Sequence, residues 1–183
     1  MCLLITPRDP SIKEVIWSHP LHYWIKCNID GASIENPGNS AYGGIFRNNE
    51  TDFLCCFAEP LGYSNSYLAE ISGALRAIEL AYQNNWHNIW LETDSSLVVL
   101  AFHKEGKIPL SLRNRWHNIK TKMKQMNCMV THIYREGNEV ADSLANFGLS
   151  LQKLTIWLEL PRFVRANFVK NKIAMLSFRF KYF

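Results

Sequence analysis

The sequence has no long hydrophobic run, no internal repeat and no Cys-x-x-Cys motif, and these absences narrow the possible classes of protein. The apolar start, residues 1–5, is short, follows no basic segment and meets Pro7 almost at once, so we expect neither a signal peptide nor a membrane span. The five cysteines are odd in number and mostly lie in apolar runs, which favours free thiols. We therefore expect an intracellular protein in a reducing compartment, the nucleus or the cytoplasm.

The length of 183 residues and the hydrophobic content of 48% are enough to bury one core. We expect a monomer with one domain over 21–150, preceded by an N-terminal extension, 1–20, and followed by a basic, apolar tail, 151–183. The tail has no clean period and is interrupted by Pro161. It could be a packed appendix, a loose arm or the remnant of a larger ancestral protein.

The net charge of +4 is unevenly distributed along the chain. The tail holds seven of the twenty Lys and Arg against the single acid Glu159, and the segment 104–124 holds seven more against Glu105. The rest of the chain is therefore acidic. An acidic body with a basic segment fits a protein that holds metal ions at one place and phosphates at another, although a basic run can equally be a solvated helix face.

Hydrophobic periodicity predicts an α/β domain whose first three strands pair antiparallel. Residues 24–30 alternate between an apolar face, with Cys27 and Ile29, and a polar face that ends in Asp30, which is the pattern of a half-buried strand. The expected strands are 24–30, 42–47, 53–58, 89–93 and 129–134, and the expected helices are 66–82, 94–106, 111–123 and 138–147. The expected helix caps are Asn65 or Ser66, Ser111 and Asn138.

Four acidic residues lie where a strand ends or where a helix begins to pack on the sheet: Asp30, Glu70, Asp94 and Asp142. Carboxylates that converge raise one another's pKa values unless cations lie between them, so such a set makes chemical sense as a site for hard divalent ions. Oxygen ligands suit Mg²⁺ and Mn²⁺, and paired ions of this type commonly catalyse the cleavage of phosphodiester bonds.

Each acid also has a purely structural interpretation. Asp30 could end a strand before a turn, Asp94 could cap a helix, and Asp142 could interact favourably with a helix dipole. Two observations favour a site instead. Asp30 should point to the side of the strand that the first helix covers. Glu70 shares a helix stripe with small residues, which lets that helix approach the sheet closely and draws Glu70 toward the strands.

The four acids lie in four ordered motifs. These are Asn28-Ile29-Asp30-Gly31-Ala32 followed by Asn36-Pro37-Gly38 and Gly43-Gly44; Ala69-Glu70-Ile71 with Ala74-Leu75; Glu92-Thr93-Asp94-Ser95; and the run from Arg135 to Ala145. Together they resemble the ribonuclease H domain of type 1, specifically plant proteins related to the tail domain of retroelement reverse transcriptases, over about residues 12–150.

The resemblance implies the RNase H-like fold, a mixed five-stranded sheet with helices on both faces. It also implies an endonuclease that cuts the RNA strand of RNA/DNA hybrids with two Mg²⁺ ions, for which Mn²⁺ could substitute, leaving a 5′ phosphate and a 3′ hydroxyl. By motif, the catalytic and metal-binding residues would be Asp30, Glu70, Asp94 and Asp142. The residues expected to contact nucleic acid are Asn36, Asn65, Ser66 and Arg135.

The chain departs from many family members in the loop before Asp142, which carries a histidine in those relatives and is contracted here to Arg135-Glu136-Gly137. We interpret His132 as a strand residue and Arg135 as the better candidate for an auxiliary role, and we expect a lower rate of cleavage. Two alternatives remain. One is a catalytically idle, retroelement-derived module that binds nucleic acid through 104–124, and the other is a related nuclease, integrase or exonuclease of the same fold.

Overall fold

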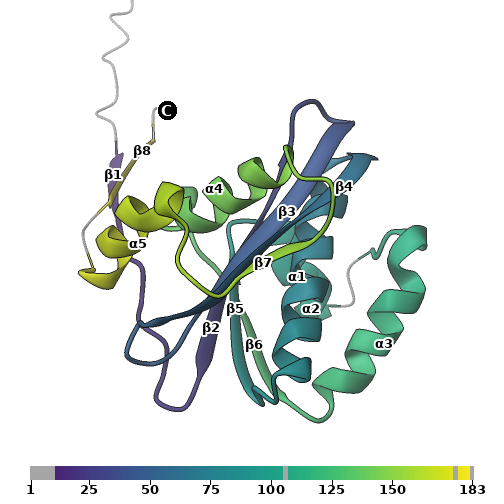
Figure 1. Ribbon diagram of the computed structural model, residues 1–183, viewed down its shortest axis with the longest axis horizontal. Helices are drawn as coiled ribbons and strands as arrows, with labels where there is room; N and C mark the ends of the chain where they lie inside the picture. The colour runs from purple at the N-terminus through teal and green to yellow at the C-terminus, as the bar shows by residue number, and fades with distance from the viewer. Residues whose placement is uncertain (1–10, 105–106, 175–176, 182–183) are drawn as a thin grey trace, which may run out of the picture.

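The computed structural model describes residues 11–104, 107–174 and 177–181, which form a mixed sheet with helices on both faces (Figure 1). The strands are β1 (Ser11–Val15), β2 (Ile25–Ser33), β3 (Gly38–Arg47), β4 (Phe53–Ser64), β5 (Asn88–Thr93), β6 (Asn127–His132), β7 (Thr155–Trp157) and β8 (Ser177–Lys181). The helices are α1 (Ser66–Gln83), α2 (Ser96–Lys104), α3 (Arg113–Met123), α4 (Glu139–Gly148) and α5 (Arg165–Lys172), with single 3-10 turns at η1 (Leu110–Leu112), η2 (Arg135–Gly137) and η3 (Arg162–Val164).

The main sheet has the strand order β6-β5-β2-β3-β4-β7. β2, β3 and β4 pair antiparallel in succession, while β5 is parallel to β2 and β6 is parallel to β5. This confirms the predicted mixed sheet with its three antiparallel strands first. A sixth strand, β7, comes from the tail and pairs antiparallel with β4 over three residues, too few to show a period in the sequence.

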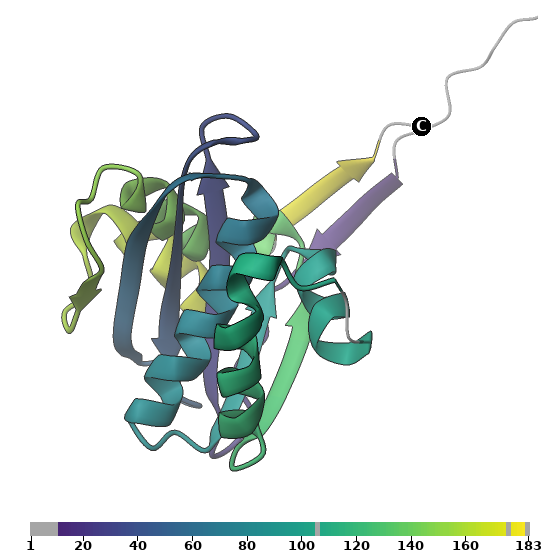
Figure 2. The same ribbon diagram turned by 90° about the vertical axis from the view of Figure 1, so that its right-hand side faces the viewer.

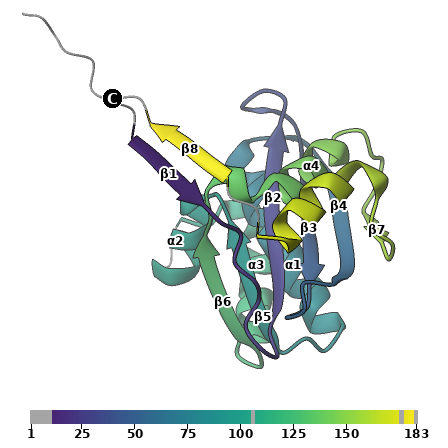
Figure 3. The same ribbon diagram turned by 90° about the vertical axis from the view of Figure 1, so that its left-hand side faces the viewer.

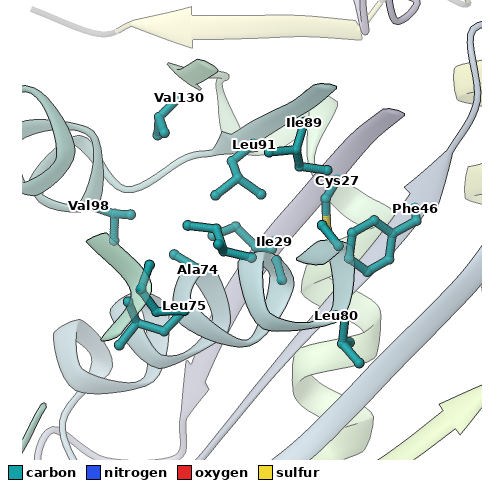
Figure 4. Packing of buried hydrophobic residues seen from close by; sticks show 14 of the residues in the cluster. Cys27, Ile29, Phe46, Ala74, Leu75, Leu80, Ile89, Leu91, Val98 and Val130 are labelled. Carbon is teal, nitrogen blue, oxygen red and sulfur yellow. The ribbon is translucent and has the colours of Figure 1, made fainter. Parts of the chain in front are cut away.

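The sheet separates two apolar cores. α1, α2 and α3 cover one face, and α4 and α5 cover the other (Figure 1). On the first face, Figure 4 shows Cys27 and Ile29 of β2 and Leu91 of β5 beside Ala74 and Leu75 of α1, all of them fully buried. The second core is formed by residues of β3, β4, α4, η3 and α5, namely Ile45, Cys56, Val140, Leu144, Val164 and Phe168.

β2 is buried on both faces, which corrects the prediction of a half-buried strand ending at Asp30. Lys26, Asn28 and Asp30 are 0%, 2% and 5% exposed, and the strand runs on past Asp30. Because β2 lies between β3 and β5 with helices on both sides, neither of its faces meets water. Asp30 thus lies in the middle of a central strand and does not end the strand before a turn.

Asp30 lies on the α4 face of the sheet, not on the face covered by the first helix as the alternation suggested. Cys27 and Ile29 pack on α1, so Asp30 points to the opposite side. Its register partner Gly43 approaches α4 so closely that a Cβ there would lie 2.8 Å from the backbone nitrogen of Ala145. Alternation distinguishes two faces of a strand but does not say which helix covers each.

The N-terminal extension is part of the packed body through the buried cation Lys26. Its Nζ lies 2.7 Å from Glu92 Oε2 and sits over the rings of Trp17 and Trp90, 4.7 Å and 3.9 Å from their centroids. Burial lowers the pKa of Lys26 to about 8, a shift that the Glu92 carboxylate opposes. Trp17, which precedes the main sheet, is 2% exposed and therefore belongs to the core.

The predicted helix caps are only partly correct. Asn65 Oδ1 accepts a hydrogen bond from Leu68 N at 2.8 Å, which confirms the cap of α1. Ser111 caps no helix, because α3 begins at Arg113 directly after η1 and has no side-chain cap. Asn138 stands at the start of α4, but its amide donates instead to the carbonyl of Ile29 at 3.0 Å and so ties α4 to β2.

The two ends of the described chain meet in a separate two-stranded ribbon. β1 and β8 pair antiparallel, and Figures 2 and 3 show this ribbon projecting from the body. It leaves the body at the end of the sheet toward which β6 runs (Figure 3). Among the described helices, none combines the length and the apolar character that crossing a membrane requires.

Candidate active site

All four predicted acids line one cavity of about 260 Å³. It lies where the carboxyl end of β5 and the middle of β2 meet the starts of α1 and α4. The lining residues are Asp30, Gly31, Ala32, Ser33, Ser66, Glu70, Asp94, Arg135, Asp142 and Asn146. Carboxylates separated by more than a hundred positions in the sequence therefore face a common space.

A glycine brings Glu70 to the cavity. A Cβ at Gly31 would lie 2.5 Å from the backbone nitrogen of Glu70 and 2.8 Å from the carbonyl carbon of Ala69. Only a residue without a side chain lets α1 approach β2 this closely. The backbone nitrogen of Gly31 also donates to Asp30 Oδ1 at 2.8 Å, which fixes the orientation of that carboxylate.

Asp94 is free of the capping role that its position suggested. The residue after it, Ser95, accepts a long hydrogen bond of 3.4 Å from Val98 N and so takes the cap position of α2. The Ser95 hydroxyl also donates to Glu70 Oε2, which links two of the four motifs. The carbonyl of Asp94 contacts His132 Nε2 at 3.0 Å, and His132 is the last residue of β6, as the strand interpretation expected.

Asp142 has the basic partner that the sequence did not reveal. Arg135 Nη2 donates to Asp142 Oδ1 at 2.8 Å, with the Arg135 side chain 71% exposed at the rim. α4 carries Asp142 in its first turn and packs closely on β3 at its second turn, where Gly43 leaves room for Leu144 and Ala145. The contracted loop thus supplies a cation at the edge of the acidic cavity.

Burial and mutual repulsion perturb the acids of the cavity. Desolvation, followed by the negative charge of Asp94, raises the pKa of Asp30 to about 8. Burial likewise raises the pKa values of Glu70 and Asp94 above their ordinary range, although the Ser95 hydroxyl opposes the shift of Glu70. Strongly perturbed carboxyls that share one cavity are a mark of a functional site.

As they stand, no group of three or more His, Cys, Asp or Glu side chains in the described part of the chain is arranged to hold a metal ion. The four acids that line the cavity nevertheless present carboxylate oxygens to it. Hard oxygen ligands of this type are those that Mg²⁺ and Mn²⁺ prefer.

The residues expected to contact nucleic acid lie around the cavity rather than together inside it. Ser66 and Arg135 line it. Asn36 is exposed, and its Oδ1 accepts a hydrogen bond of 3.1 Å from Ser66 N. Asn65 is also exposed, and its side chain is engaged in capping α1. Asn36 thus orders the turn that presents Ser66.

Sequence reasoning missed Asn146, which lines the cavity one helical turn after Asp142. Its amide donates to the carbonyl of Asp142 at 2.8 Å. The spacing of four residues on one helix is the signal that could have identified it.

Three cations of the basic segment lie together along α3 and its C-terminal end. Arg113, Lys120 and Lys124 line a hollow of about 390 Å³ beside Trp116. Lys120 also lies over the Trp116 ring, 5.7 Å from its centroid. This surface is distinct from the acidic cavity, which agrees with the uneven charge of the sequence.

Comparison with known proteins identifies the family. Residues 28–148, well over half of the chain, match the family model described as reverse transcriptase-like. The chain belongs to the reverse transcriptase-like family. The matched segment of this reverse transcriptase-like chain contains all four acids of the cavity and leaves both terminal extensions outside.

The curated relatives of this reverse transcriptase-like chain include ribonucleases H. A protein of Arabidopsis thaliana named "Putative ribonuclease H protein" is 32% identical over 154 residues, 81% of this chain and 24% of that protein. Ribonuclease HI of Halobacterium salinarum is 29% identical over 123 residues, 66% of this chain and 62% of that protein. The chain therefore spans only part of the length of these relatives.

Solved structures agree on the fold. RNase H1 from the halophilic archaeon Halobacterium salinarum NRC-1 matches with a TM-score of 0.62 and 26% identity, covering 69% of this chain and 97% of that one. LC11-RNase H1 in complex with an RNA/DNA hybrid matches with a TM-score of 0.61 and 23% identity, covering 68% and 96%. This reverse transcriptase-like domain has the RNase H-like fold.

Proposed function

We propose that this chain is an endonuclease that hydrolyses the RNA strand of RNA/DNA hybrids, leaving a 5′ phosphate and a 3′ hydroxyl. The observation that carries the proposal is the convergence of Asp30, Glu70, Asp94 and Asp142 on one cavity. The ribonuclease H relatives support it, as does the shared fold with a ribonuclease H1 in complex with an RNA/DNA hybrid.

The proposed cofactor is Mg²⁺, with Mn²⁺ as a substitute. Four carboxylates fit a pair of such ions in charge and in ligand type, and bound cations would offset both the burial and the repulsion by Asp94 that raise the pKa of Asp30. Two bound ions supply the activation of the attacking water and the stabilisation of the leaving 3′ oxygen.

Around the acids, two side chains would orient the substrate. Arg135 at the rim can pair with a phosphate oxygen, and its bond to Asp142 keeps the guanidinium directed at the cavity. Ser66, held by Asn36, presents a short polar group that suits the 2′-hydroxyl, which distinguishes RNA from DNA.

The test is a cleavage assay with labelled RNA/DNA hybrid, duplex RNA and duplex DNA in parallel. We expect Mg²⁺-dependent cleavage of the hybrid alone, and Asp94→Asn should lower it by at least about a hundredfold because a negatively charged oxygen is lost from the cavity. Asp52→Asn is the matched control, since Asp52 has a half-exposed side chain in the turn between β3 and β4 and pairs with Lys172 away from the cavity.

A second candidate function is a nucleic-acid-binding module that does not cut. The basic hollow of Arg113, Lys120 and Lys124 on α3 favours it, because this surface could bind phosphates without the acids. A folded wild-type chain that binds the hybrid with strong salt dependence, yet leaves it intact at millimolar Mg²⁺ and Mn²⁺, would support this candidate and contradict the endonuclease.

The origin and compartment are also proposals. The reverse transcriptase-like family and the Arabidopsis relative support a plant, retroelement-derived origin. A reducing intracellular compartment, such as the nucleus or cytoplasm, is supported by the cysteines that the structure describes as free thiols, namely Cys27, Cys55, Cys56 and Cys128.

A further inference from the structure

The β1–β8 ribbon places two cations directly opposite each other. Lys13 of β1 and Arg179 of β8 are register partners. Like charges in directly opposed positions destabilise a strand pair unless another group compensates them. Both β1 and β8 lie outside the segment 28–148 that matches the family model, so the ribbon is a feature of this chain's own extensions.

A tyrosine next to the active site compensates part of this charge. Lys13 Nζ and Arg179 Cζ lie 4.4 Å and 4.9 Å from the centroid of the Tyr134 ring, and Lys13 Nζ donates to the Tyr134 hydroxyl at 2.6 Å. Glu136 approaches Arg179 at 3.7 Å. No carboxylate among residues 11–104, 107–174 and 177–181 forms an ion pair with Lys13, so the two cations have one acidic partner between them.

A second hollow adjoins the acidic cavity and includes Glu136, the acid that the ribbon contacts. This hollow, of about 230 Å³, is lined by Arg135, Glu136, Glu139 and Asp142. Arg135 and Asp142 belong to both hollows, and Glu136 is the acid that Arg179 approaches. The second hollow thus extends from the carboxylates past Arg135 as far as Glu136, which Arg179 of the ribbon approaches.

Charge decides what the surface beyond these hollows can hold. Carboxylates dominate the lining of both hollows and repel phosphates unless cations neutralise them, whereas Lys13 and Arg179 of the ribbon form a positively charged place over the Tyr134 ring. The Lys13 side chain is exposed, and that of Arg179 is 37% exposed, so both can meet a ligand. A polyanion that extends beyond the cavity, such as a sugar-phosphate backbone, matches this distribution.

We propose that the β1–β8 ribbon binds the sugar-phosphate backbone of the nucleic acid whose scissile bond lies in the acidic cavity, with Lys13 and Arg179 contacting phosphates beyond it. The inference rests on the proposed function, because it takes its substrate class from there. The two extensions that the family model leaves out would thereby enlarge the substrate-binding surface.

The experiment measures binding of a labelled RNA/DNA hybrid by the full chain carrying Asp94→Asn, so that the substrate stays intact, between about 50 mM and about 200 mM salt. Adding K13Q and R179Q together should weaken binding at low salt and lower the slope of log K against log salt by about 2. The charge-preserving pair K13R and R179K should keep both values. Lys172→Gln, a lysine paired with Asp52 at the other end of the sheet, should leave both unchanged.

The outcomes separate the two proposals. If the Asp94→Asn parent binds the hybrid and the double Gln variant binds it with the same affinity and slope, the ribbon proposal is overturned while the endonuclease stands. If the double Gln and the charge-preserving variants lose binding equally, charge is not the reason and the ribbon proposal again fails. If the parent does not bind the hybrid at all, both proposals fail.

A kinetic measurement in the cleavage-competent chain adds a second criterion. Because Lys13 and Arg179 do not line the acidic cavity, the double Gln variant should raise KM for the hybrid more than it lowers kcat. A loss confined to kcat would show that the ribbon only supports the loop at Tyr134, and would overturn its role in binding.

Discussion

At the scale of single residues, the site depends on carboxylates that are held in an unfavourable environment. Asp30 is 5% exposed, and burial is the first cause of its raised pKa, with the charge of Asp94 second. The unfolded chain has no such environment, so its Asp30 titrates near the ordinary value of about 4. The folded chain thus binds a proton that the unfolded chain releases between about pH 4 and about pH 8, and stability in the absence of metal falls as the pH rises through this range.

Asp30→Asn should remove this pH dependence, because the amide stays neutral in both states. In the absence of divalent ions, the variant should gain free energy of unfolding over the wild type as the pH rises from 5 to 8, by an amount on the order of 4 kcal/mol. Urea unfolding at both pH values in the presence of a chelator measures the difference. A gain that is the same at pH 5 and pH 8 would contradict the raised pKa.

At the scale of elements, the site is positioned by the distance between α1 and β2, which Gly31 sets. Gly31→Ala would place its Cβ 2.5 Å from the backbone nitrogen of Glu70, so α1 must move and carry Glu70 away from the other carboxylates. We expect a loss of about 1–3 kcal/mol in unfolding free energy and a lower kcat, since small misplacements of catalytic groups lower rates strongly.

Gly73→Ala is the matched control from the helix side of the same contact. A Cβ there would lie 3.5 Å from the Asp30 carbonyl oxygen, an ordinary contact, and 3.3 Å from the Tyr42 Cβ, which requires Tyr42 to shift by a few tenths of an ångström, far less than at Gly31. Alanine also favours the helix by up to about 1 kcal/mol. Denaturation and cleavage assays on both variants measure the difference in stability and activity between them. Equal stability and activity of the two variants would show that Gly31 does not set the distance between α1 and β2.

From β2 to α4, the order and type of the main strands and helices were predictable because each shows a period of its own. α1 shows a helical stripe and the cap Asn65, and β5 is a short apolar run before Asp94. Periodicity does not show which helix or which strand packs against each face of an element. For that reason Asp30 was assigned to the wrong side of the sheet, and Lys26 was placed on a polar face although the folded chain buries it completely.

The four acids were predictable as a set, since their motifs are local and ordered, but their partners were not. Arg135 binds Asp142 within one loop and helix start, seven residues apart. The bond from Ser95 to Glu70 joins two motifs that lie far apart in the sequence. The contact between Ser95 and Glu70 depends on the packing of α1 beside β5, so only the structure reveals it.

At the scale of the whole molecule, the two terminal extensions meet on one buried arginine. Arg47 is 1% exposed, and its guanidinium lies over the rings of Trp17 and Phe168, 4.4 Å and 5.0 Å from their centroids. Its Nη2 donates to Asn171 Oδ1 at 3.2 Å, while burial lowers its pKa to about 9. Trp17 precedes the main sheet and Phe168 belongs to α5, so residues outside the family segment 28–148 complete the core on the α4 side.

The tail packs against the domain through α5, and the last prediction concerns this packing. Phe168 is 7% exposed and packs with the second core, where its ring meets Phe53 edge-on at 6.4 Å. Phe168→Ala should therefore lower the unfolding free energy by about 3–5 kcal/mol, because it leaves a cavity and uncovers Arg47. Phe178→Ala is the control, since Phe178 is 48% exposed on the ribbon and its loss should change stability far less. Chemical denaturation of both variants measures the contrast, and a Phe168→Ala chain as stable as the wild type would mean that α5 does not hold the core closed.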